Sequence, residues 1–207
     1  MRAGGETETV KEPEVLADAE LVARALRDTR AYGEIVRRFE HVLNRYVRRI
    51  LGGHVQHAED IVQESFIKAY VNLNGYDRRR PLSPWLYRIA HNETVSFLRK
   101  RGAGPLLIAG EDGRLLLERV LAEDTSFAPQ LRESDCGSLD RALNDLPPHY
   151  REVITLRYLE DKSYDEISDI LAMPPGTVAT RIRRGLQRLK TFYAARQDKE
   201  PGDHAQT

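Results

Sequence analysis

The sequence is poor in the residues that mark an exported or membrane-embedded protein. Its 207 residues include one cysteine, Cys136, so no disulfide can form within the chain. No apolar run approaches the roughly 20 residues that a membrane span needs. The first residues are acidic and lack the basic and apolar regions of a signal peptide. We therefore expect a cytoplasmic protein without a membrane span.

The sequence also lacks the motifs of common enzyme classes. It contains no glycine-rich phosphate loop and no nucleophile motif. Its six histidines are scattered, and His54 and His57 with the distant Cys136 do not make a convincing ligand set for a metal. We expect no metal, no cofactor and no enzymatic activity of its own.

The chain has no net charge, which taken alone would argue against a nucleic-acid partner. The charges are segregated, however. Residues 24–101 carry 16 basic and 8 acidic side chains, whereas residues 102–140 carry 3 basic and 8 acidic ones. Basic modules joined by acidic connectors predict polyanion binding at particular faces.

The most informative stretch is Ser163 to Lys190, which predicts two helices joined by a tight turn. Ser163 and Glu166 have the spacing of a capping box, and Pro175 suits the first turn of the second helix. At 100° per residue the second helix gathers its apolar side chains on one side. These are Val178, Ile182, Leu186 and Leu189.

The opposite side of that second helix is polar and cationic. Residues 174–190 contain five basic side chains and no acidic one. A helix held by an apolar stripe with a cationic face outward is typical of insertion into the DNA major groove. The alternative is a solvated basic face on an ordinary helical hairpin. The side chains expected to face outward are Thr180, Arg181, Arg183, Arg184 and Gln187.

An earlier helix, expected at residues 58–73, has an unusual exposed face. Its core stripe is apolar, while Asp60, Gln63, Glu64, Ile67 and Lys68 share the opposite side. A mixed acidic and apolar face inside a basic module favours a protein partner over DNA, although a merely solvated face is the alternative.

The next segment suits single-stranded nucleic acid. Residues 74–84 form a loop with Tyr76 and three consecutive arginines, and a helix expected at 85–101 carries Arg88 and Asn92 on its flank. Bases stack on aromatic rings, amides read base edges and arginines hold phosphate. The alternative makes Tyr76 a plug of the loop and Trp85 a core residue, and for Trp85 we favour the core.

The helical periods predict an all-α fold of two small domains. We expect a disordered acidic N-terminus at 1–13, a first domain at 14–101, a flexible linker at 102–134, a second domain at 135–197 and a polar tail at 198–207. Leu139, Leu143, Leu146, Val153, Ile154 and Leu156 are expected to form the small core of the second domain with the helix-turn-helix.

Three blocks in order carry a resemblance to a known family. They are AEDIVQESFIKAY, PWLYRIAHNETVSFLRKR, and LPPHYREVITLRYLEDKSYDEISDIL followed by GTVATRIRRG. Together they resemble the extracytoplasmic-function (group IV) sigma factors of bacterial RNA polymerase. The resemblance implies a transcription initiation factor with a region 2-like domain and a region 4-like helix-turn-helix domain.

The resemblance also implies partners and site residues. The polymerase β′ coiled coil would be contacted by Asp60, Gln63, Glu64 and Ile67, with the β flap as a further polymerase contact. The −10 element would be melted and one flipped base captured by Tyr76, Arg88, Ile89 and Asn92. The −35 duplex would be read by Thr177, Thr180, Arg181, Arg183, Arg184 and Arg188. Members of the family are commonly inhibited by an anti-sigma factor.

Two other functions remain open from the residues. A stand-alone helix-turn-helix repressor or activator would bind a palindromic duplex tightly by itself. An adaptor whose first domain binds protein would make DNA contact secondary. The sigma interpretation accounts for both the docking face and the single-strand segment.

Overall fold

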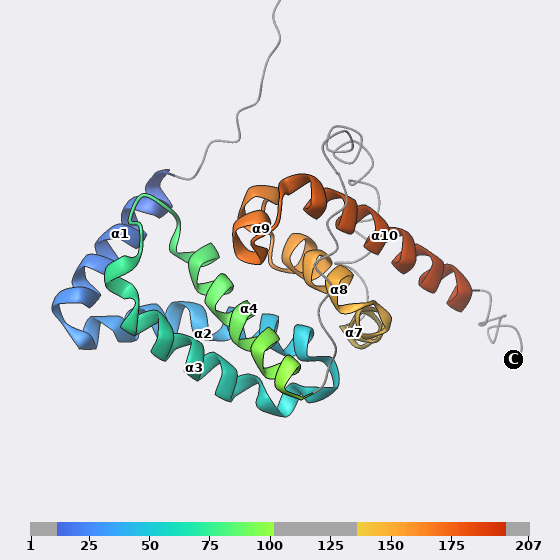
Figure 1. Ribbon diagram of the computed structural model, residues 1–207, viewed down its shortest axis with the longest axis horizontal. Helices are drawn as coiled ribbons and strands as arrows, with labels where there is room; N and C mark the ends of the chain where they lie inside the picture. The colour runs from blue at the N-terminus through green and yellow to red at the C-terminus, as the bar shows by residue number, and fades with distance from the viewer. Residues whose placement is uncertain (1–11, 102–135, 198–207) are drawn as a thin grey trace, which may run out of the picture.

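The computed structural model describes residues 12–101 and 136–197; within those ranges the regular elements are all helices, joined by short loops, and there is no strand (Figure 1). The N-terminal module, residues 12–101, contains four α-helices and two short 3₁₀ segments. In chain order these are α1 (Glu12–Arg27), α2 (Thr29–Leu51), η1 (Gly52–His57), α3 (Ala58–Val71), η2 (Leu73–Gly75) and α4 (Leu82–Lys100).

The C-terminal module, residues 136–197, is a smaller helical unit. It contains α7 (Cys136–Asp145), α8 (Pro148–Ile154), a π-helical turn η3 (Thr155–Leu159), α9 (Tyr164–Leu171) and α10 (Pro175–Gln197). The expected linker at 102–134, the tail at 198–207 and most of the expected disordered N-terminus lie outside the described residues. None of the described helices is both long and apolar enough to cross a membrane.

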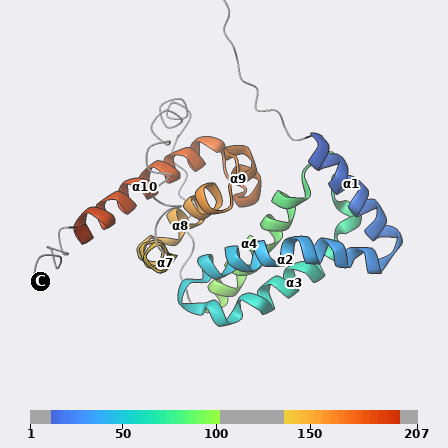
Figure 2. The same cartoon turned by 180° about the vertical axis from the view of Figure 1, so that it is seen from behind.

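Helix α2 is the spine of the N-terminal module. Its buried residues recur at helical spacing and face α3 and α4, which pack against it and against each other. The helix begins where the Asp28 carboxylate accepts the Arg30 N–H at 2.9 Å. It ends at Gly52, whose φ of 56° lies in the left-handed region that glycine tolerates. From behind, α2 and α3 lie side by side over most of their length (Figure 2).

Helix α4 begins at Leu82, three residues before the start that the sequence predicts at Trp85. Pro84 lies in its first turn, where a missing N–H costs little. The Leu82 N–H donates to the Asp18 carboxylate at 2.8 Å, so a residue of α1 satisfies the start of α4. Asp18 is buried and also accepts from Arg38 at 2.8 Å. This long-range cap ties three helices together.

The C-terminal module follows the sequence prediction closely. The Ser163 hydroxyl accepts the Glu166 N–H, and the Glu166 carboxylate accepts the Ser163 N–H, so the capping box is confirmed. Helix α9 ends at Ala172 in the left-handed conformation, and α10 begins at Pro175 as expected. The expected core residues are all buried: Leu139, Leu143, Leu146, Val153, Ile154, Leu156, Val178, Ile182, Leu186 and Leu189.

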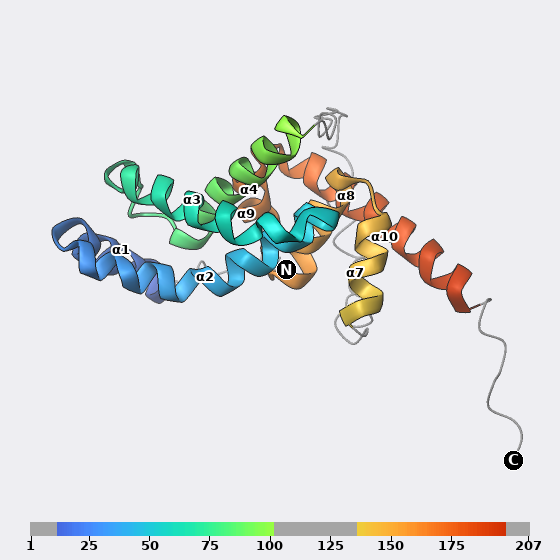
Figure 3. The same ribbon diagram turned by 90° about the horizontal axis from the view of Figure 1, so that it is seen from below.

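The two modules pack directly against each other. Helix α9 lies against α4, and α7 and α8 contact the C-terminal half of α2 (Figures 1 and 3). Arg45 and Arg49 of α2 both contact Glu160 in the other module.

Candidate nucleic-acid and polymerase interfaces

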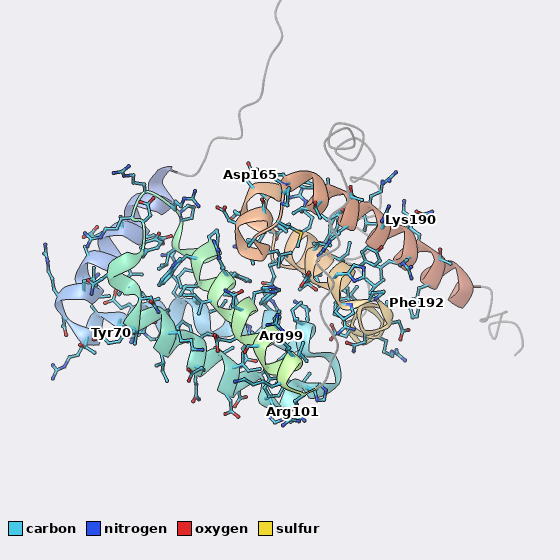
Figure 4. The ribbon with its side chains drawn as sticks, in the orientation of Figure 1. Tyr70, Arg99, Arg101, Asp165, Lys190 and Phe192 are labelled. Atoms are coloured by element: carbon cyan, nitrogen blue, oxygen red, sulfur yellow. The ribbon has the colours of Figure 1, made fainter. Side chains whose placement is uncertain are left out.

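Helix α10 presents a cationic face at the edge of the C-terminal module. Its apolar stripe is buried against α8 and α9, which leaves Arg183, Arg184 and Arg188 exposed, together with Gln187 and Lys190. Lys190 lies far along α10 (Figure 4). Gly185 allows α10 to pack closely on α8, because a Cβ there would lie 3.0 Å from Ile154 Cγ1.

Two residues expected on that face are buried instead. Thr180 is 7% exposed and donates to the Gly176 carbonyl at 2.9 Å. Arg181 is also 7% exposed, and its guanidinium donates to Glu152 Oε1 at 3.3 Å. The prediction that both point outward is wrong. Arg181 lies three positions after Val178 and so turns toward the same buried side, while Thr180 turns its hydroxyl back to a carbonyl of the preceding helical turn. Thr177 is half-buried in the first turn, with its N–H donating to the Pro174 carbonyl.

Glu152, the partner of Arg181, lies in a buried polar cluster between the modules. Its side chain is 4% exposed, and Oε2 accepts no hydrogen bond from the described residues. Burial raises the pKa of Glu152 to about 7, against a lowering effect of Arg181. His91 Nδ1 of α4 lies 4.0 Å from this oxygen and 3.1 Å from the Tyr46 hydroxyl. Burial lowers the pKa of His91 to about 4.

The buried His91 lowers the stability of the folded protein in acid. Between pH 4 and its ordinary 6.5 the unfolded chain binds a proton at His91 that the folded chain does not, so stability falls as the pH falls. His91→Gln removes this loss. Urea unfolding should show a variant about 2 kcal/mol more stable at pH 5, relative to wild type, than at pH 7.5.

Two features make the His91 comparison clean. Glu152 has the opposite effect on stability, because its raised pKa makes the folded protein less stable as the pH rises from 4.5 to 7. Glu152 is present in both wild type and His91→Gln, so its effect is common to the two. His41→Gln on the exposed side of α2 is the matched control and should keep the wild-type pH profile. Equal pH profiles for His91→Gln and wild type would contradict the prediction.

The expected single-strand residues lie along α4 and its preceding loop, with unequal exposure. Arg88 and Asn92 are exposed one turn apart, and Ile89 is half-buried. Tyr76 is 6% exposed, packs on Trp85 with ring centroids 5.2 Å apart and donates to the Arg80 carbonyl. Tyr76 thus has the position of a loop plug. Arg99 and Arg101 mark the far end of the helix (Figure 4).

The expected protein-binding face of α3 is fully accessible. Asp60, Gln63 and Glu64 are exposed, and Ile67 is 58% exposed. Lys68 is held differently, since its ammonium donates to Glu93 Oε2 at 2.5 Å. This pair gives the largely buried Glu93 of α4, whose side chain is 19% exposed, a partner on α3.

A groove of about 750 Å³ runs between α2 and α3 beside this face. Gln63, Ile67 and Tyr70 line it from α3, with Tyr70 at one end of the molecule (Figure 4). Glu40 and Asn44 line it from α2. Sequence reasoning missed the α2 wall and Tyr70, although the exposed aromatic at the end of the α3 pattern was a usable signal.

The two neighbouring histidines serve packing. His57 and His54 lie against Phe97, with ring centroids 4.8 Å and 6.4 Å away. Among the described residues no group of three or more His, Cys, Asp or Glu side chains is placed to hold a metal ion.

The arrangement is matched by known protein families. The model of Sigma-70 region 2 matches residues 35–104, and that of Sigma-70, region 4 matches residues 136–189. The ECF RNA polymerase sigma factor SigW of Bacillus subtilis is 38% identical over 171 residues, which cover 79% of this chain and 89% of SigW. This chain belongs to the extracytoplasmic-function (ECF) sigma factors.

Further relatives of this ECF sigma factor extend the match. The ECF RNA polymerase sigma-E factor of Haemophilus influenzae is 33% identical over 196 residues, covering 86% of this chain and 95% of that protein. Among solved structures, CnrH in complex with the cytosolic domain of CnrY matches with a TM-score of 0.63 and 25% identity, over 86% of this chain and 98% of CnrH. The sigma factor RpoE bound to the anti-sigma factor NepR from Bartonella quintana gives a TM-score of 0.60 and 25% identity, over 79% of this chain and 96% of RpoE.

Proposed function

We propose that this ECF sigma factor divides promoter recognition between its two modules while core RNA polymerase performs the chemistry. The observation that carries the proposal is the pairing of two different surfaces on one chain. One is the acidic and apolar face of α3 beside a groove, and the other is the cationic face of α10. A stand-alone repressor is not favoured, because both modules match sigma-factor regions.

The C-terminal module reads the −35 duplex through α10. Arg183, Arg184 and Arg188 are exposed along one side of this helix, and arginine can contact guanine edges bidentately or neutralise phosphate. Thr177 at the start of the helix suits a phosphate contact. Thr180 and Arg181 would reach DNA only after leaving their contacts with Gly176 and Glu152, so we assign them a lesser part.

The N-terminal module opens and holds the −10 element. Arg88 and Asn92 lie on the exposed side of α4, where Arg88 can contact phosphate and Asn92 can contact a base edge. The half-buried Ile89 between them adds an apolar surface against which a base can pack. Tyr76 would stack on a flipped base only if its loop moved, because its ring now packs on Trp85. Flipping a base costs a few kcal/mol, which such contacts offset.

Asn92 tests the −10 assignment. Asn92→Ala removes an amide that can bond a base edge but no hydrogen bond described within the fold. We expect promoter opening to slow by about tenfold while closed-complex formation changes little. Opening is followed by 2-aminopurine fluorescence in the −10 region. Gln56→Ala, an exposed amide on η1, is the control, and an unchanged opening rate for Asn92→Ala would remove Asn92 from the pocket.

The polymerase partner is proposed to dock on α3. Asp60 and Glu64 complement a basic partner surface, while Ile67 and the groove beside it accept an apolar side chain. In family terms the partner is the β′ coiled coil, with the β flap as a second contact to the C-terminal module. With these partners the protein would act on DNA together with polymerase in the cytoplasm.

An anti-sigma protein is a further proposed partner. Two solved relatives are a sigma factor bound to an anti-sigma factor and CnrH bound to the cytosolic domain of CnrY. Such a partner would act by covering the α3 face, the α10 face or both.

The proposal is tested by a fluorescence titration of promoter DNA with the purified protein, with and without bacterial core polymerase. We expect tight, specific binding only when core is present. Tight binding by the protein alone as a dimer, unchanged by core, would favour the stand-alone regulator instead.

A further inference from the structure

We propose that the outer face of α2 is a further DNA-binding surface, which holds the phosphate backbone of duplex DNA without reading its sequence. This surface, the α2 stripe, consists of Arg30, Arg37, His41 and Arg48. It lies apart from the −10 and −35 faces, because α2 and α4 lie at opposite edges of the N-terminal module in Figure 3 and α10 belongs to the other module. The inference therefore goes beyond the proposed function.

The helical period places the four side chains of the α2 stripe on one line. At 100° per residue they fall within about 40° of one another, opposite the buried side of α2 that faces α3 and α4. All four are exposed. Arg30 and Arg48 lie about 27 Å apart along the helix axis, at 1.5 Å per residue. The stripe therefore follows most of the solvent side of α2.

The positive charge of the stripe is not cancelled by nearby carboxylates. Glu34, at the edge of the same arc, accepts a hydrogen bond from Arg24 of α1 at 2.6 Å, so this pair adds no net negative charge. Glu40 lies to the side, where it lines the groove between α2 and α3. Within the described part of the chain, none of the three arginines of the stripe forms an ion pair. Their guanidinium groups are available to an anionic partner.

The composition of this face favours a phosphate backbone over a protein. Protein interfaces are centred on apolar or aromatic anchors and are depleted of charge at their centre. No apolar side chain lies within the arc of the stripe, because the apolar residues of α2 face the core. A membrane surface is disfavoured for the same reason, since no apolar side chain is free to enter lipid.

Duplex DNA matches the stripe in charge and in length. B-DNA carries a phosphate about every 3.4 Å along each strand, so about 27 Å corresponds to about eight base pairs. Arginine can donate two parallel hydrogen bonds to a phosphate, and such contacts carry no sequence information. Contacts of this kind speed the association of a protein with DNA and let it slide along the duplex. For a protein with the proposed function, the α2 stripe would support the search for promoters.

The test is a titration of a short fluorescent duplex of non-promoter sequence with the full-length protein, without polymerase, at several salt concentrations. Wild type should bind weakly, with a Kd of about 10⁻⁶–10⁻⁴ M and a steep salt dependence. The triple variant Arg30→Gln, Arg37→Gln and Arg48→Gln should bind about tenfold or more weakly. It should also reduce the slope of log K against log salt concentration by about 2.7, because each lost phosphate contact removes about 0.9.

Two matched variants separate the stripe from a general effect of charge. Lysine at the same three positions keeps the charge and should retain the wild-type slope. The variant Arg27→Gln, Lys100→Gln and Arg141→Gln removes three charges from exposed positions elsewhere and should also keep that slope. Circular dichroism establishes that each variant is folded. If the triple glutamine variant is not, Arg37→Gln alone replaces it, with an expected slope change of about 0.9.

Four outcomes would overturn the proposal. Wild type would not bind the duplex at low salt, the triple glutamine variant would keep the wild-type slope, or the control variant would lose as much affinity. In the fourth, the triple variant would lose binding to phosphatidylglycerol vesicles or to polyglutamate while duplex binding stayed unchanged, which would assign the stripe to a membrane or to an acidic protein. Failure of the proposed function is distinguishable, because it is measured only with core polymerase and promoter DNA.

Discussion

Replacing Ile67 by aspartate is expected to lower the affinity for core polymerase by about thirtyfold or more. Ile67 is the apolar centre of a face that also carries Asp60, Gln63 and Glu64, and it borders the groove between α2 and α3. Truncating a central anchor of an interface typically costs 2 kcal/mol or more, and an added carboxylate buried there has no partner. Because Ile67 is 58% exposed in the free protein, folding should be unaffected.

The control for Ile67 is the same substitution at another exposed apolar position. Val55 lies on η1, away from the α3 face, and is 38% exposed. Val55→Asp should bind core as wild type does in a fluorescence titration. If Ile67→Asp also bound core with wild-type affinity, α3 would not be the docking face.

Replacing Arg184 by alanine is expected to weaken binding to the −35 duplex by about 5-fold to 150-fold. Arg184 is exposed on α10 beside Arg183, and an arginine that reads a base contributes about 1–3 kcal/mol of discrimination. Core docking should remain intact, since Arg184 lies on the other module. The measurement is duplex binding by the holoenzyme at several salt concentrations, on −35 elements of intact and altered sequence.

The dependence of duplex binding on salt and on the −35 sequence shows whether Arg184 contacts a base or only a phosphate. A base contact weakens binding mainly to the intact element, whereas a phosphate contact weakens all sequences and reduces the salt slope by about one. Arg27→Ala removes the same charge from an exposed position on α1 and should change neither. Equal loss of duplex binding and core docking in Arg184→Ala would contradict the assignment of α10.

The local features of this fold are predictable from sequence because their partners lie close along the chain. The capping box joins residues three apart, and Pro175 fixes its own helix start. The apolar stripes of α3 and α10 need only the helical period. Exposure of the α3 face and of Arg183, Arg184 and Gln187 followed from the same rule.

The features that the sequence did not predict depend on partners distant in the chain. Glu160 meets Arg45 and Arg49 across more than 100 positions, and Asp18 caps α4 across 64. A charged side chain is predicted to be exposed when its partner cannot be identified from the sequence. Arg181 is therefore predicted to be exposed, although its hydrogen bond to Glu152 keeps it buried. Tyr76 was open to two interpretations for the same reason, since its contact with Trp85 exists only in three dimensions.

Promoter selection by this protein is tested by transcription of bacterial genomic DNA in vitro by core polymerase with and without it, followed by sequencing of the 5′ ends. We predict new transcripts that appear only when the protein is added, share a common pair of upstream elements, and are lost with Ile67→Asp. Identical 5′ ends in the two reactions would show that this chain does not direct core polymerase to promoters.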